Sequence, residues 1–151
     1  MIPRTLVFGI GNPSRGDDAV GPVILERLAV SLAAEIARGD VELLTDFQLQ
    51  IEHTLDLRHR DRVIFVDASV SAPAPLTFTR AFARRDASIT THAMSPEALL
   101  ETFRASFGEP PEAWIMAVRG EQFELGEPPG TEARERVDLA VAELERRLRG
   151  S

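Results

Sequence analysis

The stretch Gly9–Pro22, with the sequence GIGNPSRGDDAVGP, joins two different sequence patterns. Before it, residues 4–8 (RTLVF) form a short run of apolar and β-branched side chains, which is typical of a buried strand. After it, residues 20–36 carry apolar side chains at helical spacing, namely Ile24, Leu28, Leu32 and Ile36. A strand, a glycine-rich loop and a helix in this order predict the first unit of an α/β fold.

The same alternation continues along the chain. We expect further strands at residues 41–45, 62–67, 76–83 and 114–118, and further helices at residues 51–60, 96–107 and from 131 onward. The third strand contains four consecutive apolar residues (VIFV), as in a parallel sheet buried on both faces. The fourth alternates instead, as an antiparallel edge strand does. We therefore expect residues 1–151 to form one domain, a three-layer α/β sandwich around a mostly parallel five-stranded sheet.

Composition narrows the classes of function. The 151 residues include no cysteine, which excludes a disulfide framework, a thiolate metal site and a cysteine nucleophile. The formal net charge of -7 disfavours nucleic acid as a partner. No apolar run reaches the ~20 residues that a membrane span needs. We expect a cytoplasmic protein with no membrane partner.

Polar residues follow several of the predicted strands. Asp17 and Asp18 come after the first strand, Asp67 ends the third, and His92 precedes the helix at 96–107. In a parallel sheet these positions meet at one edge. Carboxylate oxygens and an imidazole nitrogen suit a divalent ion such as nickel, zinc or cobalt, and the charge of Asp18 would raise the pKa of Asp67 unless a cation neutralised it. The sequence therefore predicts a cation at this edge, near Asp17 or Asp18, Asp67 and His92.

Each of these residues also has a simpler interpretation. An aspartate at a strand end often caps the next loop, and a lone histidine in a loop usually lies on the surface. One of Asp17 and Asp18 is expected to be an N-cap or a first-turn acid that faces the helix dipole. His53 and His59 are expected to be solvated on a polar helix face. The case for a site rests on three separate segments that bring polar groups to the same edge.

Other chemistry-bearing motifs are incomplete. The third glycine after Gly9 and Gly11 comes too late for a dinucleotide-binding loop, no lysine is present to complete a P-loop, and no serine lies in a G-x-S-x-G elbow. Asp46, Gln48 and Gln50 follow the second strand at the same predicted edge. They are able either to hydrogen-bond a peptide backbone or to cap the following helix.

Three motifs together resemble the endopeptidases that mature nickel-iron hydrogenases. They are GIGNPSRGDDAVGP at residues 9–22, VIFVDAS at 63–69 and HAMSPE at 92–97. The similarity extends over essentially the whole chain and includes VRGEQFELGEPP at 118–129. Members of this family often have glutamate in place of Asp18.

A further departure from the family pattern lies at residues 46–50. Many members have a glycine-rich DGGT-like turn here, whereas this chain has DFQLQ. The glutamines resemble the branch that serves soluble NAD-coupled hydrogenases. By this resemblance, Asp46, Gln48 and Gln50 contact the substrate and match it to the protease.

The resemblance implies an endopeptidase that removes the C-terminal extension from the nickel-loaded precursor of a hydrogenase large subunit. The nickel belongs to the precursor and is contacted by Asp18, Asp67 and His92, which act either in catalysis or in recognition. Another divalent ion is able to occupy the site in the isolated protein. The expected partner is the precursor, and the expected oligomeric state is a monomer.

Two rival functions come from different classes. GIGNP also resembles the first motif of peptidyl-tRNA hydrolases, but those enzymes need a histidine soon after the loop, and none occurs here before His53. The other rival is a non-catalytic module that senses nickel-loaded precursor without cutting it.

Overall fold

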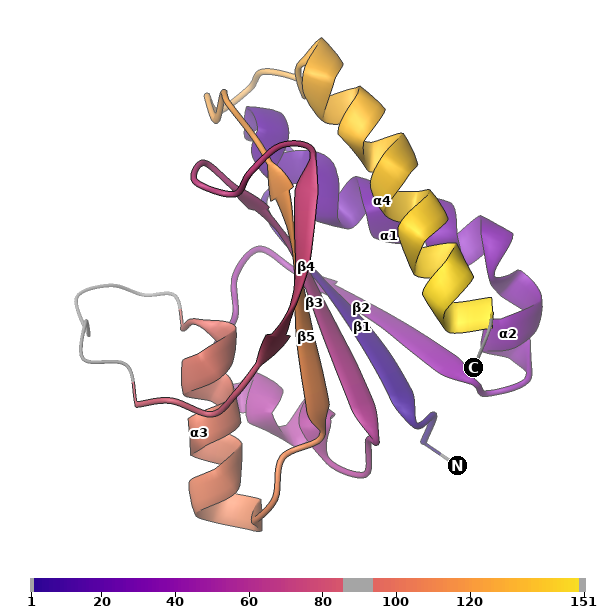
Figure 1. Cartoon of the computed structure of the whole chain (residues 1–151), viewed down its shortest axis with the longest axis vertical. Helices are drawn as coiled ribbons and strands as arrows, with labels where there is room; N and C mark the ends of the chain where they lie inside the picture. The colour runs from indigo at the N-terminus through magenta and orange to yellow at the C-terminus, as the bar shows by residue number, and fades with distance from the viewer. Residues whose placement is uncertain (1, 86–93, 150–151) are drawn as a thin grey trace.

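The computed structural model describes residues 2–85 and 94–149 (Figure 1). Its centre is a five-stranded sheet with the strand order β2-β1-β3-β5-β4. The strands are β1 (Thr5–Ile10), β2 (Val41–Asp46), β3 (Arg62–Ser69), β4 (Leu76–Ala81) and β5 (Glu112–Arg119). The pairs β1–β2, β1–β3 and β3–β5 are parallel, and β4 is antiparallel to β5 at the edge of the sheet. The predicted mostly parallel sheet with one antiparallel edge strand is confirmed.

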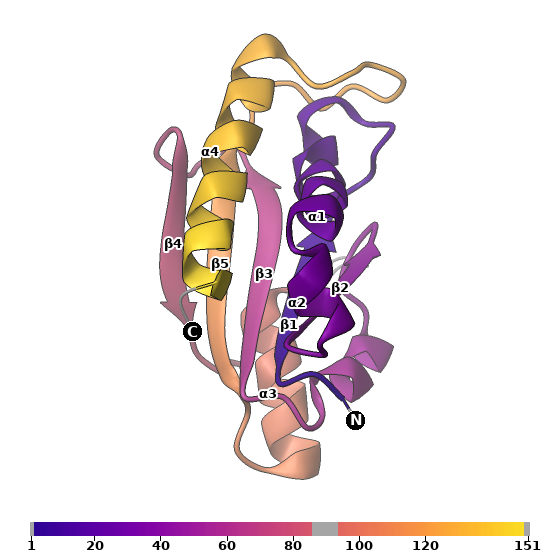
Figure 2. The same ribbon diagram turned by 90° about the vertical axis from the view of Figure 1, so that its right-hand side faces the viewer.

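Helices cover both faces of this sheet. On one face lie α1 (Val20–Ser31), α2 (Ala33–Ala37) and α4 (Thr131–Arg149), which stand in front of the strands in Figure 2. On the other lie α3 (Pro96–Phe107) and the 3-10 helix η2 (Ile51–Leu57). The predicted three-layer sandwich is therefore confirmed. No helix in the described part of the chain combines the length and the apolar character needed to cross a bilayer.

Alternation along the central strands separates two apolar cores. Val7 and Ile64 belong to the core under α1 and α4, whereas Phe8 and Phe65, their neighbours in sequence, belong to the core under α3. This is the two-residue period of a strand, in which successive side chains point to opposite faces. All four of these side chains are buried, as the continuous apolar runs of β1 and β3 predict.

Several boundaries differ from the sequence-based expectation. The predicted helix at 20–36 is broken at Leu32, whose φ of -107° and ψ of 23° are not helical, so that α1 and α2 are separate. The segment expected to be an α-helix at 51–60 is the shorter 3-10 helix η2. Strand β4 ends at Ala81 rather than at residue 83, and β5 is longer than predicted. The two strand changes lie at element ends, where local signals are weakest.

Candidate functional site

The candidate site lies where β1 and β3 end and α1 begins. Gly9 of β1 is paired with Val66 of β3, so Asp67 lies beside the end of β1. Helix α1 approaches this point closely, because a Cβ on Gly21 would lie 2.4 Å from the carbonyl oxygen of Ile10 and 3.0 Å from that of Val66. The start of α1 is thereby packed directly against the carboxyl ends of two central strands, which is the usual ligand position in parallel α/β folds.

The loop after β1 turns back onto the strand through Gly11. This residue has a φ of +148°, and a Cβ there would lie 2.0 Å from the carbonyl oxygen of Asp18. Only glycine permits so close an approach of two backbone segments. Asp18 lies in the 3-10 helix η1 (Gly16–Ala19), and its Oδ2 accepts a hydrogen bond of 2.7 Å from the N–H of Asn12. The Asp18 side chain is therefore held against the backbone of Asn12, at the start of the same loop.

Asp67 and Asp18 influence each other electrostatically. Burial raises the pKa of Asp67 to about 7, and the negative charge of Asp18 acts in the same direction, against a hydrogen bond from the N–H of Ala68. The neighbouring acids thus have the effect that the sequence predicts. A buried carboxyl group whose ionisation is opposed by a neighbouring carboxylate marks a place where a cation would be stabilised.

Asp17 has a different environment from its neighbour Asp18. It lies in the first turn of η1, but its side chain is only 2% exposed and points to the loop between β5 and α4. Its Oδ2 accepts hydrogen bonds from the N–H groups of Glu121 (2.8 Å) and Gln122 (3.1 Å), and its Oδ1 accepts one from Gly130 (2.8 Å). One of the two acids was expected to cap the helix or to face its dipole. Asp17 lies in the first turn of η1, but its carboxylate also binds the backbone of a loop that is distant in the sequence.

These contacts also set the charge state of Asp17. Burial would raise its pKa, but the three backbone hydrogen bonds and the positive charge of Arg136 outweigh burial and hold the pKa below its ordinary value. Further backbone contacts join the two loops: the N–H of Asp17 donates to Gln122, and the N–H of Gly16 donates to Glu127. The loop that carries Asp18 and the loop before α4 form one hydrogen-bonded unit.

The segment at residues 46–50 borders the site from the end of β2. The carbonyl oxygen of Asp46 accepts a hydrogen bond from the N–H of Gly11 (3.0 Å), and that of Leu49 accepts one from Met94 (3.2 Å). Of the three predicted substrate contacts in this segment, the side chains of Asp46 and Gln50 are exposed and Gln48 is half-buried. Strand β1 pairs with β2 up to Ile10 and Asp46, so the segment begins directly beside the acidic loop.

His53 is a residue that sequence reasoning misjudged. It was expected to be solvated, but it is buried and its ring meets that of Phe8 edge to face with 4.8 Å between the centroids. The cause is that η2 is a 3-10 helix, whose period turns residues 53, 54 and 57 toward the core. A signal was present in the spacing Gln50-x-x-His53, which is that of a capping box. The expectation for His59 is correct, because that side chain is exposed.

The third predicted cation ligand, His92, lies outside the described residues. Within residues 2–85 and 94–149, no group of three or more histidine, aspartate or glutamate side chains is arranged to hold a metal ion. Of the three predicted ligands, Asp18 and Asp67 lie in the described part of the chain. The assignment of all three residues as cation ligands stays a prediction from the sequence.

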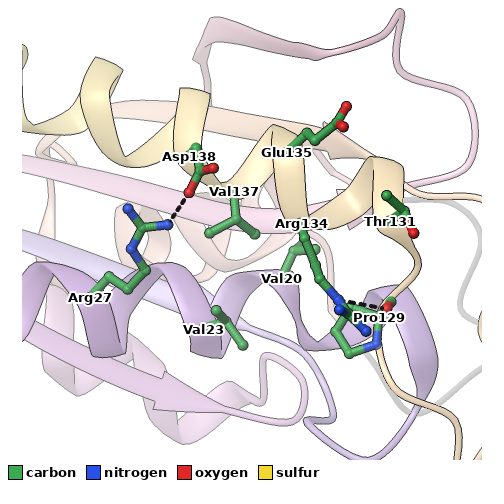
Figure 3. Close-up of a pocket in the computed structure, with 9 residues that line it drawn as sticks. All are labelled: Val20, Val23, Arg27, Pro129, Thr131, Arg134, Glu135, Val137 and Asp138. Atoms are coloured by element: carbon green, nitrogen blue, oxygen red, sulfur yellow. Dashed lines mark hydrogen bonds and ion pairs between the residues drawn. The ribbon is translucent and has the colours of Figure 1, made fainter.

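A pocket of about 340 Å³ lies away from these carboxylates, between α1 and α4 (Figure 3). Val20, Val23 and Val137 form an apolar floor, and Arg27 and Arg134 lie at its rim. Both arginines already have partners in the protein, since Arg27 is paired with Asp138 and Arg134 donates to the carbonyl oxygen of Pro129. Asp18 and Asp67 do not line this pocket, and the chemistry of the strand ends does not involve it.

The similarity of this chain to known proteins was found by comparison with solved structures. The sequence matches no protein-family model and no curated protein. The fold is similar to that of the hydrogenase maturating endopeptidase HybD from E. coli, with a TM-score of 0.73 and 24% identity over 97% of this chain and 93% of that chain.

Two archaeal structures are similar to nearly the same extent. The NiFe hydrogenase maturation protease HycI from Thermococcus kodakarensis has a TM-score of 0.72 and 22% identity over 97% of this chain and 92% of that chain. The hydrogenase 2 maturation peptidase from a Thaumarchaeota archaeon has a TM-score of 0.68 and 22% identity over 96% and 97% of the two chains. The chain has the fold of the hydrogenase maturation endopeptidases, as its motifs predict.

Proposed function

We propose that this protein is an endopeptidase that removes the C-terminal extension from the nickel-loaded precursor of a hydrogenase large subunit. The proposal is supported above all by the position of Asp18 and Asp67 at the ends of β1 and β3, in a fold shared over nearly its whole length with proteins described as hydrogenase maturation proteases. The three motifs that resemble this family include both residues.

In this proposal, the two carboxylates contact the nickel that the precursor carries. Their oxygen donors suit a borderline divalent ion, and a cation between them would relieve the repulsion that helps to raise the pKa of Asp67. His92 is the proposed third ligand. Because the precursor brings its own ion, the free protein needs no resident metal, although another divalent ion is able to bind in its place.

The segment at residues 46–50 is proposed to hold the precursor chain. Gln50 is exposed and Gln48 half-buried, and a glutamine side chain has both donor and acceptor groups for an extended peptide backbone. The segment lies directly beside the loop that carries Asp18, because Gly11 and Asp46 are hydrogen-bonded. A peptide on this segment would therefore pass close to the two carboxylates. We also propose that the precursor belongs to a soluble NAD-coupled hydrogenase.

Peptide hydrolysis at this site proceeds without an acyl-enzyme on cysteine, because the chain contains none. In the free protein the pKa of Asp67 is raised to about 7, and a bound cation would hold its carboxylate in the ionised form that a metal ligand needs. The nickel polarises the scissile carbonyl or activates the water. A role of the three ligands in recognition alone is the other version of this mechanism.

The decisive experiment compares nickel-loaded and nickel-free precursor incubated with the purified protein, with mass spectrometry of the products. The proposal predicts cleavage of the loaded form alone, at one bond near its C-terminus. Binding of the loaded form without cleavage would instead support a nickel-sensing module. Release of the peptide from peptidyl-tRNA would support the peptidyl-tRNA hydrolase hypothesis, and either outcome would overturn the protease. The protein is proposed to act as a cytoplasmic monomer.

A further inference from the structure

A second set of polar side chains, centred on His53, lies beside the proposed site. The Nε2 atom of His53 is 3.1 Å from Oδ2 of Asp46, and its Nδ1 accepts a hydrogen bond of 2.8 Å from the N–H of Gln50. The other carboxylate oxygen of Asp46 accepts from the N–H of Phe47 at 2.7 Å. The carbonyl oxygen of Gln50 accepts in turn from the N–H of His53 at 2.9 Å. Together these bonds close a ring around residues 46–53.

This ring fixes the state of the imidazole. A backbone N–H only donates, so Nδ1 of His53 carries no proton and the ring proton is on Nε2, where it is donated to Asp46. Both nitrogens are therefore occupied, and the ring packs against that of Phe8. His53 is neither a metal ligand nor a proton carrier in this arrangement, so its effect must be on the conformation of its neighbours.

The part of the chain that the ring closes is in contact with two other segments. Asp46 accepts a backbone hydrogen bond from Gly11, the residue before Asn12, whose N–H holds the Asp18 carboxylate. Leu49 accepts one from Met94, just before α3 begins. Leu49 anchors the segment in the core under α3 and is only 1% exposed, whereas Phe47 is 60% exposed and Gln50 is exposed as well. The exposed residues on either side of Leu49 thus depend on the hydrogen bonds around His53 for their conformation.

We infer that His53 is a positioning residue for substrate binding, which acts through the Asp46 carboxylate and the Gln50 backbone to present residues 47–50 to the precursor. The inference rests on the proposed function. It also changes the role of Asp46: both of its carboxylate oxygens have partners within the protein, so it shapes the segment while Gln48 and Gln50 make the contacts with the peptide. A preorganised segment avoids the cost of ordering itself when it binds.

The test measures processing of nickel-loaded precursor over a range of concentrations, with wild type and three variants. His53→Phe keeps an aromatic ring against Phe8 but removes both polar contacts. His53→Gln keeps an acceptor and a donor on one side chain. His59→Asn is the control at an exposed histidine with a φ of 66°, a conformation that asparagine tolerates.

We expect His53→Phe to raise KM about tenfold with kcat changed less than about twofold, because binding rather than chemistry depends on the segment. His53→Gln is expected to restore most of the wild-type KM, and His59→Asn to leave both constants unchanged. In the free proteins, hydrogen exchange at the amides of Phe47 and Gln50 is expected to be faster in His53→Phe. A purely structural loss would reduce the active fraction and hence kcat, with KM unchanged.

Wild-type KM in His53→Phe, or a fall in kcat alone, would overturn the inference and leave the proposed function standing. If wild type itself leaves the loaded precursor uncut, the proposed function fails and this inference fails with it. If His53→Phe does not fold, NMR of the wild-type imidazole tests the inference instead. A proton on Nδ1 would contradict the assignment. A protected proton on Nε2, together with rescue by His53→Gln, would support it.

Discussion

The carboxylate of Asp18 lies near enough to Asp67 for its negative charge to add to burial, and together they raise the pKa of Asp67 to about 7. The backbone of the acidic loop enforces this proximity, because Gly11 lets the Asp18 backbone approach the end of β1. The free protein therefore keeps two acids together although this opposes the ionisation of Asp67. This arrangement is unfavourable for stability alone and favourable for holding a cation.

Replacing Asp67 by asparagine should change how stability depends on pH. With a folded pKa of about 7 against an ordinary value of 3.8, the folded protein binds a proton that the unfolded chain has lost between these values. Wild-type stability therefore falls as pH rises through this window. We expect Asp67→Asn to flatten this decline and to stabilise the protein by on the order of 3 kcal/mol above pH 7. Urea unfolding at several pH values measures it, and parallel curves for the two proteins would contradict the shifted pKa.

Removing the carboxylates of the site should abolish processing without unfolding the protein. We expect Asp18→Ala and Asp67→Ala each to reduce kcat/KM by about 10²-fold or more. His92→Ala is expected to do the same, while Asp18→Glu should retain activity because it keeps the carboxylate. The matched control is Asp61→Ala, at the opposite end of β3, whose side chain is 68% exposed. Full activity in the three alanine variants, with folding shown by circular dichroism, would remove the site assignment.

Asp17 should matter for stability rather than for chemistry. Asp17→Asn leaves one acceptor oxygen and an amide donor facing three backbone N–H groups, so we expect a loss of about 2–4 kcal/mol in the free energy of unfolding. The pKa of Asp17 is lowered, so its contribution is present above the ordinary value of 3.8 and is lost as pH falls through the folded pKa. The gap between variant and wild type should shrink in acid. Asp40→Asn, at an exposed ion pair with Arg38, is the control.

Gly11 should be far less tolerant of a side chain than another glycine of positive φ. Gly39 has a φ of +81° and nothing within 4 Å of an added Cβ, so Gly39→Ala should cost only about 1–2 kcal/mol of backbone strain. Gly11→Ala adds a collision at 2.0 Å with the Asp18 carbonyl oxygen. We expect a larger loss of stability and loss of processing together. Equal thermal unfolding midpoints in the two variants would show that the close approach is not required.

The sequence allows the layers and the sheet to be predicted because they depend on local patterns. The buried run of β3 and the alternation of β4 each show within a few residues which face is covered. Convergence of Asp18 and Asp67 follows from the parallel arrangement alone. The role of Asp17 could not be predicted in this way, because its hydrogen-bond partners lie in a loop far along the chain. The burial of His53 could not be predicted either, because it depends on a 3-10 helix that helical periodicity does not reveal.

The contacts of Asp17 have a consequence for synthesis of the protein. The three N–H groups that hold its carboxylate belong to residues 104, 105 and 113 positions later in the chain. While the ribosome is still adding these residues, the acidic loop has no partner for Asp17 and cannot take its final shape. The nascent chain therefore passes most of its synthesis without the contacts that fix the acidic loop against the loop before α4.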